Sequence, residues 1–169
     1  MLAVTHAAIS QLTGISRSTL YRHWPRLEDL RNATIARAAT TRGGTNSAQE
    51  PAQERSLEAD LHWILGHLMT ALNETPWGKI APHVIAAAAT EDQTRALLGK
   101  WIADRSQDVR SVFEAAIERG EIGANAPVSQ LVELAIAVPY FRKFVAGSEL
   151  DQDWLDAHVA LICDMAAEG

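Results

Sequence analysis

Near the start of the chain, the sequence VTHAAISQLTGISRSTLYRHW contains two short helix patterns separated by one glycine. Thr5 is a residue type that favours the N-cap of a helix, so it predicts a first helix over residues 6–13. Gly14 tolerates the left-handed backbone of a sharp turn. Ser16 can cap a second helix that follows at once. Two capped helices joined by a short turn with glycine are typical of a helix-turn-helix motif.

The second predicted helix, residues 17–24, has one apolar side and one polar side. At about 100° per residue, Leu20 and Trp24 point inward together. The polar side and its flanks carry arginine, hydroxyl, tyrosine and histidine groups: Arg17, Ser18, Thr19, Tyr21, Arg22 and His23. Eight residues span about 12 Å, the width of the major groove of B-DNA. Because arginine can pair with guanine, and tyrosine and threonine can reach phosphates or a thymine methyl group, this side predicts contact with double-stranded DNA.

The longer segment VTHAAISQLTGISRSTLYRHWPRLEDL resembles the DNA-binding region of TetR-family transcriptional regulators. The family pattern is a Gly-Val/Ile-Ser turn, then Thr-Leu-Tyr-x-His-Phe, then a Pro/Ser-Lys-Glu-x-Leu helix start, and the match covers residues 4–38. The resemblance implies base contacts from Arg17, Ser18, Tyr21 and Arg22. It implies phosphate contacts from Thr5, Thr19, Tyr21 and His23.

The segment departs from the family pattern at two places. The phosphate-contacting lysine of the family falls on Leu27, so we expect Arg26, one position earlier, to replace it. Family members also have a full helix before the position of Val4, which completes the small N-terminal core, and only three residues precede Val4 here. We therefore expect this first helix to be missing, DNA binding to be weak, and each fully exposed apolar side chain to forfeit about 1.5–3 kcal/mol of burial. The side chains expected to be partly uncovered are Ala8, Ile9, Leu12, Leu20, Trp24, Leu27 and Leu30.

The charge of the chain changes sign between a short N-terminal part and a longer remainder. Residues 1–42 hold six arginines and two acidic residues, a net charge of +4, whereas residues 43–169 have a net charge of −10. Residues 40–55, TTRGGTNSAQEPAQER, contain a glycine pair, a proline and few apolar residues, which predicts a linker. We therefore predict a DNA-binding domain over residues 1–42. Residues 43–169 resemble the ligand-binding and dimerisation domain of the family.

Helical periodicity dominates the second domain and strand patterns are nearly absent, so we predict an all-α fold. Caps, glycines and prolines divide this domain into about five helices. One is capped by Ser56 and ends before Thr75-Pro76, and one over 77–90 is kinked or broken by Pro82. The others cover about 92–119, 128–146 and 152–167. Stacked together, they form a helical bundle like that of the TetR family.

Aromatic and histidine side chains of the bundle predict an apolar pocket with a few polar groups. The candidates are Trp63, His67, Trp77, His83, Trp101, Phe113, Tyr140 and Phe144. The ligand expected there is an apolar or aromatic small molecule. Ordinary core packing is the alternative role for each of these side chains.

A helix-turn-helix offers few contacts on its own, so specific DNA binding predicts a two-fold homodimer. The apolar stripes of the last two helices predict the interface, and the resemblance implies the same place. The candidates are Leu131, Leu134, Val138, Leu155, Val159 and Ile162. Packing within one chain is the alternative use of these stripes.

Several kinds of chemistry have no support in the sequence. It contains one cysteine and neither Cys-x-x-Cys nor His-Glu-x-x-His, so we expect no metal and no cofactor. No catalytic constellation stands out, which predicts that the protein is not an enzyme. The longest apolar runs are shorter than the roughly 18 residues that a membrane span needs, so we expect no membrane partner and a cytoplasmic protein.

These observations predict a ligand-responsive transcriptional regulator, a repressor that binds a palindromic operator as a homodimer and is released by a small-molecule effector. The alternative is a helical protein that binds a small molecule or a partner and carries a degenerate DNA-binding module. Retardation of promoter DNA in a gel distinguishes the two.

Overall fold

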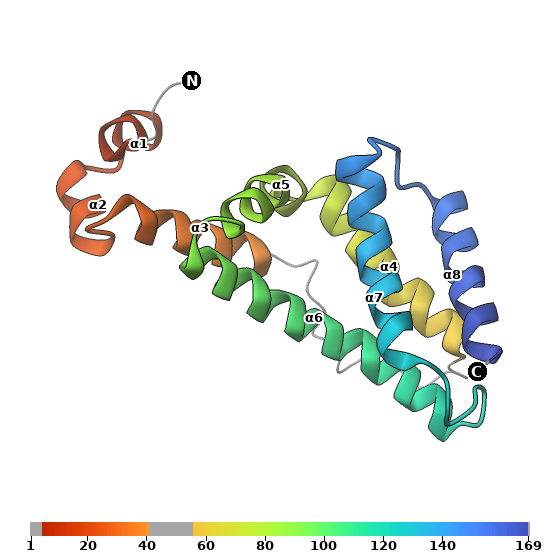
Figure 1. Cartoon of the computed structure of the whole chain (residues 1–169). Helices are drawn as coiled ribbons and strands as arrows, with labels where there is room; N and C mark the ends of the chain where they lie inside the picture. Colours follow the sequence, from red (N-terminus) through yellow and green to blue (C-terminus); the bar gives the residue numbers. More distant parts are fainter. Residues whose placement is uncertain (1–4, 41–55, 169) are drawn as a thin grey trace.

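A computed structural model of the chain describes residues 5–40 and 56–168. Within these residues it contains eight α-helices, one short π-helix and no strand, which confirms the predicted all-α fold. Figure 1 shows an elongated molecule in which the first three helices extend from one end of a helical bundle. Most of the predicted linker, with the predicted domain boundary, lies outside the described residues, so that boundary stays a prediction.

The N-terminal part consists of α1 (His6–Thr13), α2 (Arg17–His23) and α3 (Leu27–Thr40). α1 has the predicted bounds, and α2 ends one residue early because Trp24 leaves the helical conformation and forms the C-cap. Leu20 is only 1% exposed because α2 packs against α1, so the expectation that it is partly uncovered is wrong. The side chain of Leu12 lies outside the described ones. The other side chains of that apolar set are half-buried: Ala8, Ile9, Trp24, Leu27 and Leu30.

The remaining helices form the bundle, which we call the body: α4 (Leu57–Glu74), α5 (Pro76–Ala88), α6 (Asp92–Glu118), α7 (Val128–Tyr140), the π-helix η1 (Phe141–Val145) and α8 (Gln152–Ala167). The long α6 runs along the body and packs against α5 and α7, while α4 packs against α8. α3 contacts both α5 and α6, so it joins the N-terminal helices to the body (Figure 1).

The core of the body lies between α4, α5, α6, α7 and α8. Apolar side chains at helical spacing point inward from each of these helices, and the largest fully buried ones are Phe113, Leu61, Ile64, Leu68, Leu72, Leu131 and Ile162. Burying one such side chain contributes about 1.5–3 kcal/mol relative to exposure. This core fixes the positions of the helices of the body relative to one another.

Pro82 lies inside α5, and the helix continues through it. Of the two predicted effects of this proline, a kink or a break, the break does not occur. A proline removes one backbone hydrogen bond, at a cost of about 3 kcal/mol. Trp77, Ala81 and Val84 of the same helix are buried in the body, and their burial offsets this cost.

Pro139 has a larger effect, because α7 ends at the next residue and the chain continues as the π-helix η1. The single helix predicted over 128–146 is therefore two segments. Pro139 has no N–H to donate to the carbonyl of Ala135, four residues earlier. His158 on α8 is 6% exposed, and its interaction with that carbonyl raises the pKa of the imidazole, while burial lowers the pKa by more.

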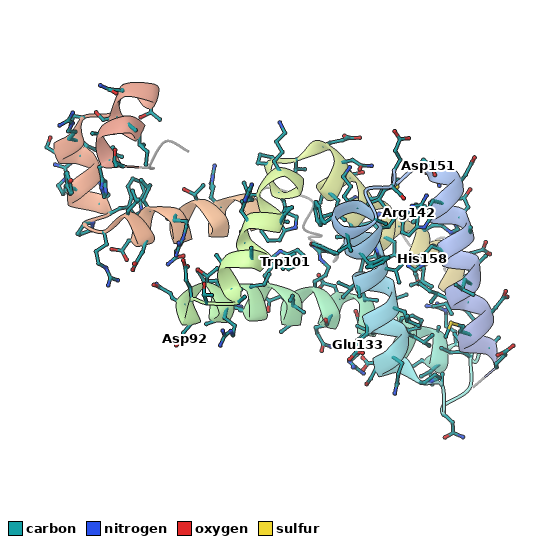
Figure 2. The ribbon with its side chains drawn as sticks, turned by 45° about the horizontal axis from the view of Figure 1, so that its top comes forward. Asp92, Trp101, Glu133, Arg142, Asp151 and His158 are labelled. Carbon is teal, nitrogen blue, oxygen red and sulfur yellow. The ribbon has the colours of Figure 1, made fainter. Side chains whose placement is uncertain are left out.

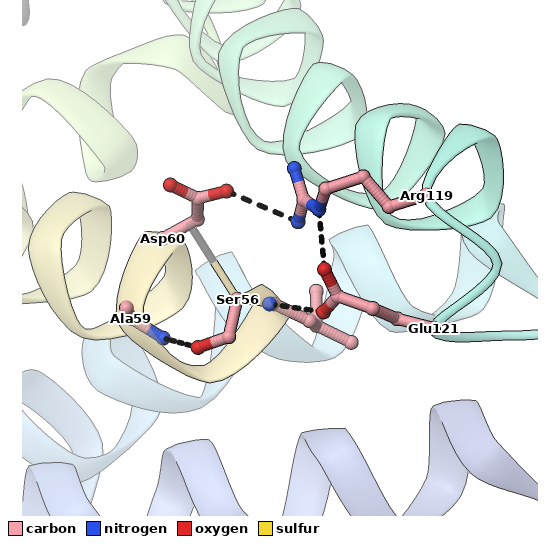
Figure 3. Close-up of polar contacts among 6 residues, drawn as sticks. Ser56, Ala59, Asp60, Arg119 and Glu121 are labelled. Carbon is pink, nitrogen blue, oxygen red and sulfur yellow. Dashed lines mark hydrogen bonds and ion pairs between the residues drawn. The ribbon is translucent and has the colours of Figure 1, made fainter. Parts of the chain in front are cut away.

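A polar network fixes the start of α4, where the chain enters the body (Figure 3). Ser56 caps α4, and the Glu121 carboxylate accepts the backbone N–H of Leu57 at 2.5 Å. Arg119, at the end of α6, pairs with Glu121 and also with Asp60 of α4, the latter at 3.3 Å. The hydrogen bond from Arg119 lowers the pKa of Glu121, so that carboxylate stays charged at neutral pH. The network therefore ties α4 to the segment that follows α6.

The backbones of α4 and α5 approach each other very closely at Gly78. A Cβ atom at this position would lie 1.9 Å from the carbonyl oxygen of Leu72, far inside van der Waals contact. Only glycine fits at this crossing. The close approach sets the position of the neighbouring Trp77, which is 3% exposed.

Candidate functional site

The ends of α1 and α2 are defined by the side chains that the sequence singles out. Thr5 Oγ1 accepts the N–H of Ala8 at 3.1 Å, and Ser16 Oγ accepts the N–H of Thr19 at 3.2 Å. Gly14, between the two helices, has a left-handed φ of 72°. Each cap contributes about 1 kcal/mol to helix stability. The predicted helix-turn-helix geometry is therefore present.

The polar side of α2 faces solvent. Thr19 is half-buried, and the other candidate DNA-binding residues of this helix are exposed: Arg17, Ser18, Tyr21, Arg22 and His23. Leu20 is buried on the opposite side and Trp24 is half-buried. The arginine-bearing side is therefore accessible to a large partner, while its contacts with DNA stay a prediction.

The hydroxyl groups at the start of α2 bond to one another. Ser16 Oγ lies 3.0 Å from Ser18 Oγ and 2.9 Å from Thr19 Oγ1. These bonds hold the first turn of the helix in one arrangement. The Thr5 hydroxyl is already occupied as the cap of α1, so a phosphate contact from it uses the remaining lone pair or the hydroxyl proton.

Arg26, expected to replace the family lysine, is held by an acidic neighbour. Its Nε lies 3.3 Å from Asp29 Oδ2 and a terminal nitrogen lies 3.1 Å from Oδ1. This hydrogen bonding lowers the pKa of Asp29, so the carboxylate is charged beside the guanidinium. A phosphate at Arg26 would compete with Asp29, which makes this contact weaker than one from a free lysine.

His6 was not singled out by the sequence reasoning, yet it connects α1 to α2. Its ring stacks on Tyr21 with centroids 4.3 Å apart and planes 23° apart. Its Nε2 donates to the carbonyl of Trp24 at 2.9 Å. The only sequence signal is a histidine directly after the Thr5 cap, which does not indicate a contact 15 residues away.

The predicted pocket residues do not form one group. Four of them, from α5, α6, α7 and η1, lie together: Trp77, Trp101, Tyr140 and Phe144. The ring centroids of Trp77 and Trp101 are 4.7 Å apart, and those of Trp101 and Tyr140 are 6.0 Å apart in an edge-to-face arrangement. Phe144 lies 5.7 Å from Tyr140. The indole N–H of Trp77 donates to the Tyr140 hydroxyl at 2.8 Å.

A pocket of about 490 Å³ opens beside this aromatic group, between α5, α6 and α7. Trp101, Tyr140 and Glu133 line it, and Figure 2 labels Trp101 on α6 and Glu133 on α7. The other lining residues are aliphatic or small: Ile85, Leu98, Ile102, Ser106, Ile136 and Ala137. Burial raises the pKa of Tyr140, so its hydroxyl keeps its proton and can donate it to a ligand. The size and the lining suit a small aromatic molecule.

The other four predicted pocket residues lie elsewhere. Phe113 is fully buried in the core, so it has no access to a ligand. Trp63 and His67 contact each other on α4, with ring centroids 4.5 Å apart. His83 lines a second apolar pocket, of about 610 Å³, together with Ile9 and residues of α3 and α5. The sequence could not separate these positions, because aromatic residues serve cores and pockets alike.

The predicted dimer interface also needs correction. Leu131, Leu155, Val159 and Ile162 are at most 3% exposed, because they pack in the core of their own chain. Of the six candidates, Leu134 is 36% exposed and Val138 is half-buried. The exposed apolar side chains of α7, η1 and α8 are different ones: Phe141, Val145, Leu161 and Met165, at 60%, 72%, 56% and 38% exposure. The exposed stripe therefore lies beside the predicted one on the same helices.

An ion pair links α3 to the start of α6. The guanidinium of Arg31 donates to Glu91 at 2.9 Å and 2.5 Å, and to the Thr94 hydroxyl at 3.3 Å. Thr94 is fully buried and donates to Glu91 at 2.8 Å. These hydrogen bonds lower the pKa of Glu91, so it stays charged. The three side chains form a clamp between the N-terminal helices and the body.

Two further results concern the described ranges 5–40 and 56–168 only. No group of three or more histidine, cysteine, aspartate or glutamate side chains there is arranged to hold a metal ion. No helix there combines the length and apolar character that crossing a membrane requires.

Comparisons with known proteins identify one family model and solved structures of similar fold. A family model described as "Tetracyclin repressor-like, C-terminal domain" matches residues 51–162. The crystal structure of the TetR family transcription regulator SCO0332 is 22% identical, covers 95% of this chain and 86% of its own, and has a TM-score of 0.66. GusR of Salmonella enterica is 18% identical, covers 97% of this chain and 85% of its own, and has a TM-score of 0.75. No curated protein matches the chain. The two structural likenesses show a shared fold.

Proposed function

Because the chain belongs to the TetR family of transcriptional regulators, we propose that it is a repressor that binds a palindromic operator as a homodimer and is released by a small molecule. The observation that carries the proposal is that α2 has two different sides. The side that bears arginine and tyrosine is exposed, and Leu20 on the opposite side is buried. In this proposal the protein acts in the cytoplasm by binding, without catalysis and without a cofactor.

In the DNA complex, α2 enters the major groove with its polar side. Arg17 and Arg22 have the chemistry to pair with guanine O6 and N7, and Ser18 and Tyr21 can contact neighbouring bases. Thr5, Thr19 and His23 lie at the edges, where phosphates pass. The net charge of +4 over residues 1–42 attracts the DNA backbone, while the acidic remainder of the chain is repelled from it.

The homodimer uses the exposed stripe of α7, η1 and α8, which consists of Leu134, Phe141, Val145, Leu161 and Met165. Exposed apolar side chains that gather on adjacent helices mark a partner surface. A two-fold dimer pairs such a surface with its own copy. The resulting pair of α2 helices can then contact two successive turns of the major groove, about 34 Å apart.

The effector is an apolar or aromatic molecule that binds the pocket between α5, α6 and α7. The rings of Trp101 and Tyr140 lie at 73° to each other, and a flat molecule can pack against either of them. The Tyr140 hydroxyl accepts from Trp77 and has its own proton to donate to the ligand. Glu133, at the exposed edge, can accept a hydrogen bond from a polar end of the molecule.

In this proposal, α6 couples ligand binding in the pocket to the position of α3. Leu98 and Trp101 line the pocket four and seven residues after Thr94, so the clamp and the pocket wall lie within about 10 Å along one rigid helix. A ligand that favours a shifted α6 strains the hydrogen bonds that Arg31 donates to Glu91 and therefore moves α3. The affinity for DNA falls by the same factor by which the ligand prefers the shifted arrangement.

One observation favours the alternative, a helical binding protein with a degenerate DNA-binding module. Ile9, Leu27 and Leu30 line an open apolar pocket between the N-terminal helices and α5. Apolar surface at this junction is available to a small molecule or to a partner. Such a protein would select no DNA sequence.

The experiment is selection from a random duplex library by the wild-type chain, followed by footprinting of the selected duplex. The regulator proposal predicts an inverted repeat whose half-sites are centred about 34 Å apart or at a related spacing, bound by two copies of the chain. Light scattering of the complex measures the copy number. Selection of no common sequence would reject the regulator and leave the alternative.

A further inference from the structure

His6 is a buried side chain of α1 that makes two contacts with the DNA-facing helix α2. It stacks on Tyr21 with ring centroids 4.3 Å apart, and its Nε2 bonds to the carbonyl of Trp24 at 2.9 Å. From this geometry we propose that His6 is a positioning residue for operator recognition, holding the Tyr21 side chain in the orientation that meets DNA. This inference rests on the proposed function as a DNA-binding regulator.

The bond to Trp24 fixes the imidazole itself. A carbonyl oxygen only accepts, so Nε2 carries the proton and donates it. Trp24 forms the C-cap of α2, where carbonyl groups lack partners within the helix. His6 is 7% exposed, so its ring has little room to turn. The ring plane is therefore set by the two helices together.

The stack then restrains Tyr21. This side chain is 54% exposed, so without a neighbour it would sample several rotamers. Stacking against a fixed imidazole selects one of them and leaves the hydroxyl accessible. A side chain ordered before binding loses less entropy when the complex forms, which raises the affinity without adding a contact to DNA.

The chemistry of His6 allows its two contacts to be separated by substitution. His6→Phe keeps a ring for the stack and loses the donor, whereas His6→Gln keeps a donor and loses the ring. Positioning through the stack predicts that His6→Ala and His6→Gln weaken binding to the selected duplex about tenfold, the upper range for an aromatic pair. His6→Phe should stay within about threefold of wild type.

The same measurement in a Tyr21→Leu background separates positioning from folding. With the tyrosine ring removed, His6→Ala should change the affinity less than about twofold, since nothing remains to be positioned. A merely structural histidine would cause the same loss in both backgrounds. Equal losses, or rescue by His6→Gln and not by His6→Phe, would overturn the proposal. Circular dichroism of each variant checks that the helices are intact.

A readout without DNA keeps this inference apart from the proposed function. In the free protein, Tyr21→Leu should move the NMR resonances of the His6 ring protons, because a stacked tyrosine shields them. Unmoved resonances would overturn the inference even if the wild-type chain binds its operator. If the resonances move and the wild-type chain selects no duplex, the proposed function fails and the recognition role of His6 fails with it, while the stack itself is established.

Discussion

Gly78→Ala tests the close approach of α4 and α5, which positions Trp77 behind the pocket. The added Cβ would lie 1.9 Å from the carbonyl oxygen of Leu72. A backbone atom cannot rotate away as a side chain can, so the helices must separate by about 1.5 Å or more to bring this 1.9 Å approach to the 3.4–4 Å of ordinary van der Waals contact. Overpacking of this kind costs about 3 kcal/mol, and the gain of up to about 1 kcal/mol in helix propensity offsets part of it. We expect a net loss of about 2 kcal/mol in the free energy of unfolding.

Gly99→Ala is the matched control, because a Cβ at this exposed position of α6 meets nothing within 4 Å. It should stabilise the protein by about 1 kcal/mol. For 169 residues, the unfolding entropy is about 0.35 kcal/mol per kelvin, so Gly78→Ala should lower the Tm by about 6 °C and Gly99→Ala should raise it by about 3 °C. Thermal melts followed by circular dichroism measure both. A Gly78→Ala variant that melts with or above the wild type would refute the account of this crossing.

Three further perturbations test the body, the dimer and the clamp. Burial lowers the pKa of His158 below its usual 6.5, so the unfolded chain takes up a proton that the folded chain resists. Stability should fall as the pH drops from 6.5 towards 5, and urea titrations should show a flatter pH dependence for His158→Phe than for wild type. Phe141→Asp should shift the protein to monomers in light scattering with its circular dichroism unchanged, because this side chain is 60% exposed in the single chain; a persistent dimer would exclude the exposed stripe as the interface. Arg31→Glu and Glu91→Arg should each change the affinity for the operator, and the double exchange should restore it. Anisotropy titrations measure these affinities. Single variants that bind the operator like the wild type would show that the clamp plays no part in placing α3.

Local signals made the N-terminal geometry predictable. Thr5 and Ser16 cap the helices that follow them, and Gly14 has the left-handed backbone that its position suggests. Each of these assignments depends on interactions within four residues, which the sequence displays directly. The orientation of α2 followed from the same local pattern, because Leu20 is its one strongly apolar interior residue.

Contacts between distant helices were not predictable in this way. Leu131 and Ile162 lie on apolar stripes. An apolar stripe can pack within one chain or between two chains, and the sequence does not distinguish these two uses. The end of α7 one residue after Pro139 was not predicted either, and nothing in the sequence places His158 of the next helix beside this segment. The pocket was not predictable for the same reason, because it depends on how α5, α6 and α7 pack against one another.

The central claim is that the exposed side of α2 recognises DNA bases, and the operator affinity of Arg22→Ala tests it most directly. Lys100→Ala is the control, because this exposed lysine of α6 pairs with Asp104, four residues along the same helix, at 2.9 Å. Anisotropy titrations against the selected duplex and its single-base variants should show a loss of about 1–3 kcal/mol for Arg22→Ala and a relaxed preference at one base pair, with Lys100→Ala unchanged. Equal affinities for Arg22→Ala and the wild type on every duplex would contradict the account.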